Sequence, residues 1–177
     1  GLERSKVTED LVESVLKKHL NRKFVLDAGA LQMMKVEWLK DLKEPAIITP
    51  HQREFEAMFK VSIADLSVEK KVLEVQKKAK EFNCIILLKA VVDIVSDGTD
   101  TFVVEGGNQG LTKGGTGDIL AGLVSGFVTH SDPISACVCS SYVLKKSADQ
   151  LFLSHGYWYN NSDILDAIPK VVNSIFI

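Results

Sequence analysis

The chain has 177 residues, of which 46% are hydrophobic and 25% are charged, as expected for a globular domain with a sizeable core. Its net charge of −2 argues against binding to nucleic acid or an anionic membrane, and no apolar run approaches the roughly 20 residues of a membrane helix. An odd number of cysteines, three, argues against a disulfide framework and favours buried free thiols in a reducing cytoplasm.

The first half of the chain alternates helices with short apolar runs. Ser5 can cap a first helix, whose apolar face we expect to comprise Val7, Leu11, Val12, Val15 and Leu16. The longest amphipathic segment turns its lysines outward and buries Val72, Val75, Ala79 and Phe82. The elements expected here are helix 6–20, strand 24–26, a helix from about residue 30, strand 46–48, helix 52–59, helix 68–82 and strand 84–88.

The second half is expected to open with a hairpin, in which Asp97-Gly98 joins two apolar runs, 91–95 and 101–104. Six glycines then fall within residues 106–117, which predicts a flexible loop. An apolar stripe at helical spacing follows directly, so the loop leads into a helix.

Two more helices are expected towards the end of the chain. Asp132 and Pro133 are typical of a helix start, and this helix reaches about Leu153. Ser162 is expected to cap the last helix, 163–175, which contains Pro169 and should bend there. The order of elements predicts an α/β fold in which parallel strands come first and an antiparallel hairpin comes late.

Polar residues lie just beyond three of the predicted strands, namely Asp27, His51 and Lys89. Parallel strands end at one edge of a sheet, and open α/β sheets bind their ligands at that edge. Each residue also has a simpler interpretation. Asp27 can cap the next helix, His51 can be a solvated loop residue, and Lys89 can extend from a sheet edge into solvent.

The end of the glycine-rich segment, Gly114 to Gly117, lies where a helix should begin. Unpaired backbone N–H groups and the positive end of the helix dipole make such a position an anion site. Asp118 adds a carboxylate, which is either an ordinary first-turn acid or a general base. A base beside anion-binding amides suits an enzyme that activates a hydroxyl against a phosphoryl group.

Four motifs together resemble the ADP- or ATP-dependent NAD(P)H-hydrate dehydratases of the ribokinase-like superfamily. They are V-L-D-A-G-A-L at 25–31, I-T-P-H-Q-R-E-F at 48–55, L-L-K-A at 87–90 and G-N-Q-G-L-T-K-G-G-T-G-D-I-L-A-G at 107–122. They cover almost the whole chain, although G-G-T-G-D alone is shared with small-alcohol kinases. The resemblance implies a single domain over 1–177, with a three-layer α/β/α fold, a mostly parallel central sheet and a late antiparallel hairpin.

The resemblance also implies a repair reaction. The C6 hydroxyl of NADHX or NADPHX, the hydrated nicotinamide cofactors, is phosphorylated by ADP or ATP with Mg²⁺, and phosphate then leaves to restore NAD(P)H. Asp118 would be the catalytic base and would contact the substrate, as would His51. No metal ligand can be assigned. The nucleotide would be bound by Lys89, Ala90, Val91, Val92, Asp93, Gly114, Gly115, Thr116 and Gly117.

Several positions depart from the family's pattern: Gln52 and Arg53 replace Pro-Gly, Ala90 and Glu3 replace glycines, and Gly29 replaces a common aspartate. Residues 1–4 look like the middle of the family's G-P-G-L-G-R segment, so we expect the N-terminal part of the domain to be incomplete. A separate chain or domain would supply that part, or self-association into a homo-oligomer would cover the exposed sheet edge.

Two alternatives stay open at this point. One is a kinase of the same superfamily that leaves its phosphate on a small alcohol, as thiamine-precursor and pyridoxal kinases do. The other is a truncated nucleotide-binding domain without activity. Release of inorganic phosphate would favour the dehydratase, and nucleotide binding without turnover would favour the inactive domain.

Overall fold

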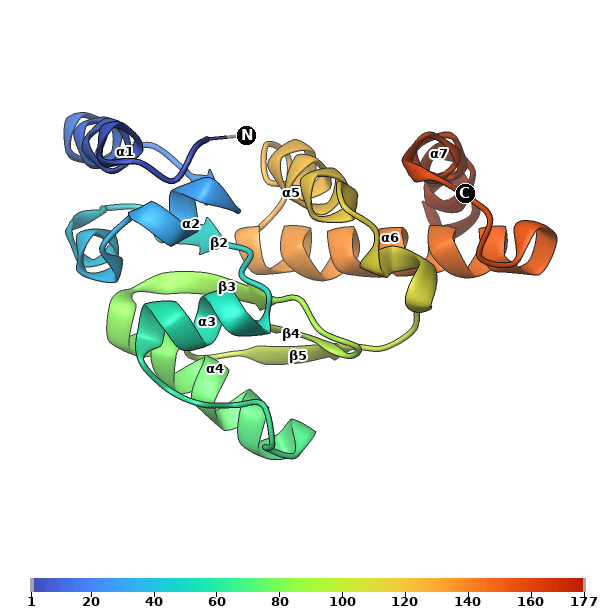
Figure 1. Cartoon of the computed structure of the whole chain (residues 1–177), viewed down its shortest axis with the longest axis horizontal. Helices are drawn as coiled ribbons and strands as arrows, with labels where there is room; N and C mark the ends of the chain where they lie inside the picture. Colours follow the sequence, from blue (N-terminus) through green and yellow to red (C-terminus); the bar gives the residue numbers. More distant parts are fainter. Residues whose placement is uncertain (1, 177) are drawn as a thin grey trace. The chain divides into compact units, whose positions relative to one another are not determined.

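The computed structural model describes residues 2–176, so Gly1 of the family-like opening segment lies outside the described part. The chain comprises two compact units, one ending at Val103 and the other beginning at Val104, which are described separately (Figure 1). None of the helices between residues 2 and 176 is long and apolar enough to cross a membrane.

A five-stranded mixed sheet forms the centre of the first unit, with strand order β1-β2-β3-β4-β5. β1 pairs with β2 and β2 with β3 in parallel, whereas β3 pairs with β4 antiparallel. The predicted α/β fold, with parallel strands followed by an antiparallel end, is confirmed. The strands are β1 (Val25–Leu26), β2 (Ala46–Ile48), β3 (Cys84–Leu88), β4 (Asp93–Ser96) and β5 (Thr101–Val104).

The hairpin differs from its prediction at its start, because β4 begins at Asp93 and leaves Val91 and Val92 in the preceding turn. The Asp97 carboxylate accepts the backbone N–H groups of Thr99 and Asp100, each at 2.8 Å, and so closes the turn between β4 and β5. Gly98 has a φ of +92°, a conformation that favours glycine.

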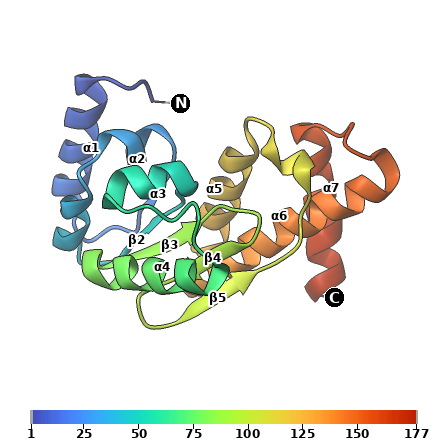
Figure 2. The same ribbon diagram turned by 60° about the horizontal axis from the view of Figure 1, so that its bottom comes forward.

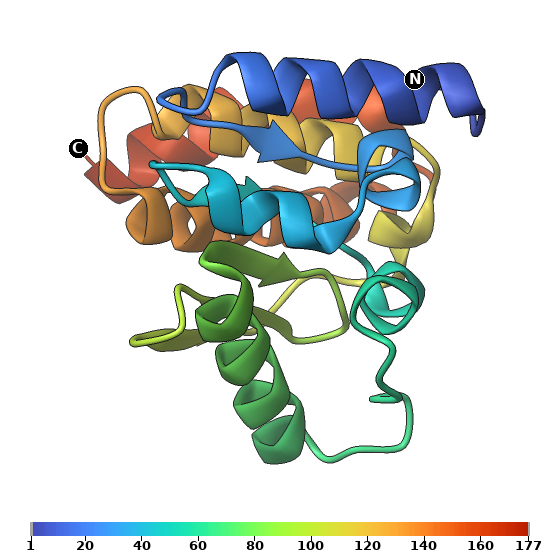
Figure 3. The ribbon, with the colours of Figure 1, turned by 90° about the vertical axis from the view of Figure 1, so that its left-hand side faces the viewer.

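The helices of the first unit are α1 (Lys6–Lys18), α2 (Gly29–Met33), the 3-10 helix η1 (Val36–Asp41), α3 (Gln52–Phe59) and α4 (Val68–Phe82). The bounds of α3 and α4 match their predictions. α1 ends at Lys18 rather than at residue 20, and it packs against α2 and η1 (Figure 3).

The expected apolar face of α1 is partly wrong. Val12 and Leu16 are buried as predicted, but Thr8 completes the buried row. The other apolar residues form a second, outward stripe, since Val7, Leu11 and Val15 are 76%, 49% and 39% exposed. Residues four apart line up on a helix, so 8, 12 and 16 share one row and 7, 11 and 15 the next.

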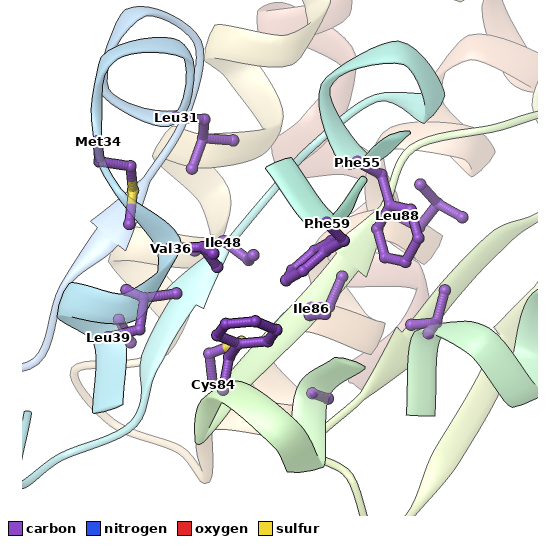
Figure 4. Close-up of a cluster of buried hydrophobic side chains, with 14 of the residues drawn as sticks. Leu31, Met34, Val36, Leu39, Ile48, Phe55, Phe59, Cys84, Ile86 and Leu88 are labelled. Carbon is purple, nitrogen blue, oxygen red and sulfur yellow. The ribbon is translucent and has the colours of Figure 1, made fainter. Parts of the chain in front are cut away.

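The core of the first unit lies between the sheet and helices α2, η1, α3 and α4 (Figure 4). Ile48, Ile86 and Leu88 project from the strands towards Phe55 and Phe59 of α3. The rings of Phe55 and Phe59, one turn apart on α3, pack with centroids 4.7 Å apart, and the Phe59 ring packs against Phe82 of α4 at 5.3 Å. Truncating a buried phenylalanine to alanine costs about 3–5 kcal/mol, so this cluster anchors the helix that follows His51.

Lys78 departs from the expected outer face of lysines on α4. Its side chain is only 11% exposed, and its ammonium donates to Glu81 at 2.7 Å. The same ammonium lies 5.7 Å from the centroid of the Phe82 ring. The ion pair and the aromatic face let this lysine cover apolar surface without leaving its charge unpaired.

The second unit is helical, with η2 (Gln109–Thr112), α5 (Thr116–Phe127), α6 (Pro133–His155) and α7 (Asn161–Phe176). α6 packs against both α5 and α7 (Figure 2). Asp132 caps α6 as predicted, with its carboxylate accepting the N–H of Ser135. Ser162 is not the cap of α7, because the side-chain oxygen of Asn160 accepts the N–H groups of Ser162 and Asp163.

Candidate functional site

Asp27 and Lys89 meet at the carboxyl ends of β1 and β3. Lys89 Nζ donates to Asp27 Oδ1 at 2.7 Å, and the two side chains are 20% and 12% exposed. β2 lies between these strands, and the backbone N–H of Lys89 donates to the carbonyl of Pro50 just beyond β2. The expected meeting of strand ends is confirmed for this pair, and each charge is already compensated by the other.

His51 ends the β2 segment and caps α3. Its Nδ1 accepts the N–H of Glu54 at 3.2 Å, while Glu54 Oε2 accepts the N–H of His51 at 3.0 Å. This reciprocal pair is a capping box with histidine in place of serine or threonine. Because Nδ1 accepts a hydrogen bond, the ring proton of neutral His51 lies on Nε2. The side chain is 50% exposed, so it offers Nε2–H as a donor.

Gln32 supports this arrangement from α2. Its side-chain amide donates to the second carboxylate oxygen of Glu54 at 2.8 Å. Glu54 is buried, and both of its oxygens are therefore satisfied. The Gln32–Glu54–His51 chain holds the imidazole in one orientation, which a solvated loop histidine would not have.

A groove of about 740 Å³ in the first unit contains His51 and Glu54. This volume lies in the range of small-molecule sites. Its apolar lining comes from Leu31, Met34, Val36, Ala57 and Met58, and its charged lining includes Arg4, Lys35, Arg53, Lys60 and Glu37.

Lys89 to Asp93, the residues expected to bind nucleotide, form a turn between β3 and β4. The buried carboxylate of Asp93 accepts the N–H of Ala90 at 2.8 Å and closes this turn. Val91 is 91% exposed at its tip. The backbone at this position is therefore shaped by Asp93 and open to solvent, as a site for phosphate or sugar requires.

The glycine-rich loop of the second unit is hydrogen-bonded along its length. Asp149 of α6 accepts the N–H of Gly107 and the side-chain amide of Asn108, at 2.9 and 3.1 Å. The Asn108 side-chain oxygen in turn accepts the hydroxyl of Tyr159 at 2.6 Å. A Cβ at Gly110 would lie only 2.0 Å from that hydroxyl, so a residue with a side chain does not fit at this position.

The last part of the loop is anchored to the segment before α7. Lys113 Nζ donates to the carbonyl oxygens of Tyr157 and Tyr159 and lies over the Tyr159 ring. The Thr116 hydroxyl is directed at the carbonyl oxygens of Leu111 and Lys113, at 2.8 and 2.9 Å. The buried Thr116 side chain thus has a structural role, which leaves its backbone N–H as the group that can contact an anion.

The start of α5 presents unpaired donors. Among residues 2–176, no acceptor is found for the backbone N–H groups of Thr116, Gly117 and Asp118. Gly115, the N-cap, has a φ of +93°, and a Cβ there would lie 2.4 Å from Asn161 Nδ2. A Cβ at Gly114 would meet no atom within 4 Å, so space is open beside the loop. These features are those that an anion site at a helix N-terminus requires, and the anion site itself stays a prediction.

Asp118 is exposed in the first turn of α5 and lines an apolar groove of about 700 Å³ within the second unit. α5 contributes Ile119, Gly122, Leu123, Gly126 and Phe127 to this groove, and α7 contributes Leu165, Ile168 and Pro169. A carboxylate in such a lining can accept a proton from a hydroxyl carried by an apolar ring.

Between residues 2 and 176, no three His, Cys, Asp or Glu side chains are close enough to hold a metal ion. Magnesium is usually bound by one or two carboxylates together with substrate phosphates, which fits an ion that arrives with a nucleotide. All three cysteines are free, and burial raises the pKa of Cys84 and Cys137 to about 12.

The residues that hold these segments in place were not predicted from the sequence; they are chiefly Gln32, Asp149, Tyr159 and Asn161. Lys145 and Asp149 are four residues apart on α6, a spacing that marks them as neighbours on one helix face. Nothing in the sequence indicates that they contact the glycine-rich loop, about 40 residues earlier. The other anchors carry no local signal.

The sheet order and the glycine loop before a helix are those of the ribokinase-like fold. A ribokinase-like superfamily protein from Enterococcus faecalis matches 98% of this chain with a TM-score of 0.82 at 24% identity, over 61% of its own length. Within that class, the chain belongs to the NAD(P)H-hydrate dehydratase family, whose pattern matches residues 1–170.

Curated proteins similar in sequence to this chain are also described as NAD(P)H-hydrate repair enzymes or dehydratases. The chain is 33% identical over 164 residues to the bifunctional NAD(P)H-hydrate repair enzyme Nnr of Archaeoglobus fulgidus, covering 93% of this chain and 32% of the relative. It is 31% identical over 149 residues to the ADP-dependent (S)-NAD(P)H-hydrate dehydratase of Cenarchaeum symbiosum, covering 83% and 50%. These two curated relatives are thus two to three times longer than the part that matches.

A solved structure with this description also aligns. The ADP/ATP-dependent NAD(P)H-hydrate dehydratase from Bacillus subtilis, co-crystallised with ATP/Mg²⁺, matches with a TM-score of 0.81 at 27% identity. The alignment covers 98% of this chain and 62% of the Bacillus chain.

Proposed function

We propose that this chain catalyses the nucleotide-dependent dehydration of NADHX and NADPHX to NADH and NADPH. In this reaction the C6 hydroxyl takes a phosphoryl group from ADP or ATP, and inorganic phosphate then leaves with a proton from the ring. The observation that carries the proposal is the start of α5, where three unpaired N–H groups adjoin the Asp118 carboxylate. Membership of the dehydratase family supports the choice of substrate.

Asp118 is the proposed general base. Its carboxylate accepts the proton of the C6 hydroxyl as that oxygen bonds to phosphorus, a role that typically contributes about 10²–10⁴-fold to a rate. The apolar groove that Asp118 lines would receive the dihydropyridine ring. The N–H groups after Gly114 stabilise negative charge on the transferring phosphoryl oxygens, which is the main electrostatic need of phosphoryl transfer.

The first unit is proposed to contribute further contacts to both substrates. His51 Nε2–H is a fixed donor for the hydrated cofactor, because the Glu54 cap holds the ring. The turn from Lys89 to Asp93 is assigned to the adenine nucleotide, as the family resemblance implies. Mg²⁺ would supply charge neutralisation of the nucleotide phosphates. Both His51 and Asp118 are proposed to contact the hydrated cofactor, as the family resemblance implies.

Absorbance at 340 nm tests the proposal, since NADHX does not absorb there as NADH does. Wild-type protein with NADHX, Mg²⁺ and ADP should give a nucleotide-dependent rise and release phosphate. Asp118→Asn should lower the rate at least 100-fold, as loss of a general base predicts, with nucleotide affinity unchanged. Asp166→Asn, an exposed acid of α7 outside the groove, is the matched control and should retain activity.

Other results would reject this assignment. A stable phosphorylated product in place of released phosphate would identify an alcohol kinase. Equal loss of binding and turnover in Asp118→Asn would show that Asp118 is structural. Sedimentation velocity of the same sample tests the expectation of a homo-oligomer.

A further inference from the structure

The groove beside His51 has an excess of positive charge. Four cationic side chains line it, Arg4, Lys35, Arg53 and Lys60, against only two carboxylates, Glu37 and Glu54. The whole chain carries a net charge of −2, so the excess is local. A concave surface lined by one sign of charge concentrates ligands of the opposite sign.

Three of these cations are available to a ligand. In the part of the chain from 2 to 176, Arg4, Arg53 and Lys60 form no ion pair with a carboxylate, whereas Lys35 lies 3.9 Å from Glu9. Glu54 cannot compensate them fully, because its oxygens accept hydrogen bonds from His51 and Gln32.

Among these cations, Arg53 is the best placed to bind a phosphate group. It lies in the first turn of α3, where the helix dipole adds positive potential, and it is exposed two residues from His51. Arginine binds phosphate with two parallel N–H donors, a geometry that lysine lacks.

The apolar part of the groove lining indicates which class of anionic ligand the groove binds. Leu31, Met34 and Met58 offer surface that a free phosphate ion would not use but that a base or ribose would cover. Two phosphorylated compounds take part in the proposed reaction, the dinucleotide and the adenine nucleotide. His51 belongs to this same groove and is assigned to the dinucleotide, so we favour the dinucleotide.

We propose that this groove binds the phosphate groups of the hydrated dinucleotide and that Arg53 makes the site selective for the 2′-phosphorylated form, NADPHX, over NADHX. The inference rests on the proposed function. Both forms share a pyrophosphate, which two of the cations suffice to neutralise. The 2′-phosphate adds nearly two further negative charges, and Arg53 supplies the uncompensated guanidinium for it.

Binding of the stable products tests this without requiring turnover. The intrinsic fluorescence of NADPH and NADH is titrated with wild-type protein, Arg53→Gln and Arg22→Gln, an exposed arginine outside the groove. Wild-type protein and Arg22→Gln should bind NADPH about tenfold more tightly than NADH, the effect of one charge-assisted hydrogen bond. Arg53→Gln should reduce this preference to less than threefold and leave NADH affinity unchanged. The preference should also shrink with added KCl.

Equal affinities of wild-type protein for NADPH and NADH would overturn the inference. So would a loss of ADP affinity in Arg53→Gln with the NADPH preference intact, since the groove would then belong to the adenine nucleotide. The 340 nm assay separates this result from the proposed function. An Arg53-dependent NADPH preference without turnover keeps the inference and rejects the dehydratase, whereas turnover without preference does the reverse.

Discussion

Two neighbouring glycines allow the proposed anion site to be tested apart from the stability of the fold. Gly114 and Gly115 both precede α5, but their surroundings differ. A methyl group at Gly114 would face open space, whereas at Gly115 it would lie 2.4 Å from Asn161 Nδ2 on a backbone with φ of +93°. Gly114→Ala should therefore perturb only a ligand, and Gly115→Ala should perturb the protein itself.

The cost at Gly115 can be worked out from two contributions. Alanine in a left-handed conformation costs about 1–2 kcal/mol. Displacing Asn161 also weakens its 2.8 Å hydrogen bond to the Gly114 carbonyl, which is worth about 1 kcal/mol. The sum, about 2–3 kcal/mol, corresponds to a fall in Tm of about 5–10 °C for a chain of this length. Gly114→Ala should stay within about 0.5 kcal/mol of wild type.

Thermal unfolding followed by circular dichroism, with calorimetric titration of ADP and Mg²⁺, measures both effects. For Gly114→Ala we expect an unchanged Tm and a nucleotide affinity lower by about tenfold, because the methyl group blocks one charge-assisted N–H contact. Unchanged nucleotide affinity in this variant would refute the view that the loop binds phosphate. An unchanged Tm in Gly115→Ala would refute the argument from φ and Asn161.

Three further predictions concern charged groups and thiols. Lys89→Met should weaken ADP binding in calorimetry, whereas Asp27→Asn should strengthen it; unchanged affinity in both would remove the pair from the nucleotide site. Burial raises the pKa of Cys84 and Cys137 to about 12, so only half-buried Cys139 should react with a thiol reagent at pH 8 until denaturant exposes all three. Because unfolded thiols ionise near pH 9, stability should fall as pH rises from 9 towards 12.

The elements that local pattern determines were predictable from sequence. β3 is an unbroken apolar run buried on both faces, and α3 and α4 have apolar spacing that fits their observed bounds. An Asp-Gly pair between two apolar runs is a strong local signal for a β-hairpin turn, and Asp97-Gly98 forms such a turn. The start of α5 was also predictable, because glycine followed by Asp118 is a local signal for a helix N-terminus.

The predictions from sequence were wrong where two local arrangements are about equally favourable and tertiary packing determines which one forms. On α1, two rows of side chains are nearly equally apolar, and only packing against α2 and η1 decides that Thr8 is buried while Val7 is exposed. At α7, Asn160 and Ser162 are both good caps, and the structure uses Asn160. Sequence also missed the role of Asp149, because its partner Gly107 is 42 residues away.

The Asp27–Lys89 pair shows how such long-range contacts change the meaning of a candidate residue. From sequence, Lys89 is a cation free to meet a phosphate, but in the fold its ammonium already contacts a carboxylate 62 residues away. A phosphate must therefore displace Asp27 or share Lys89 with it, and a partly buried pair of this kind costs about 2 kcal/mol to separate. Asp27→Asn removes that competitor while Lys89 keeps its charge. This is why the two substitutions should move nucleotide affinity in opposite directions, an outcome that a merely structural ion pair would not produce.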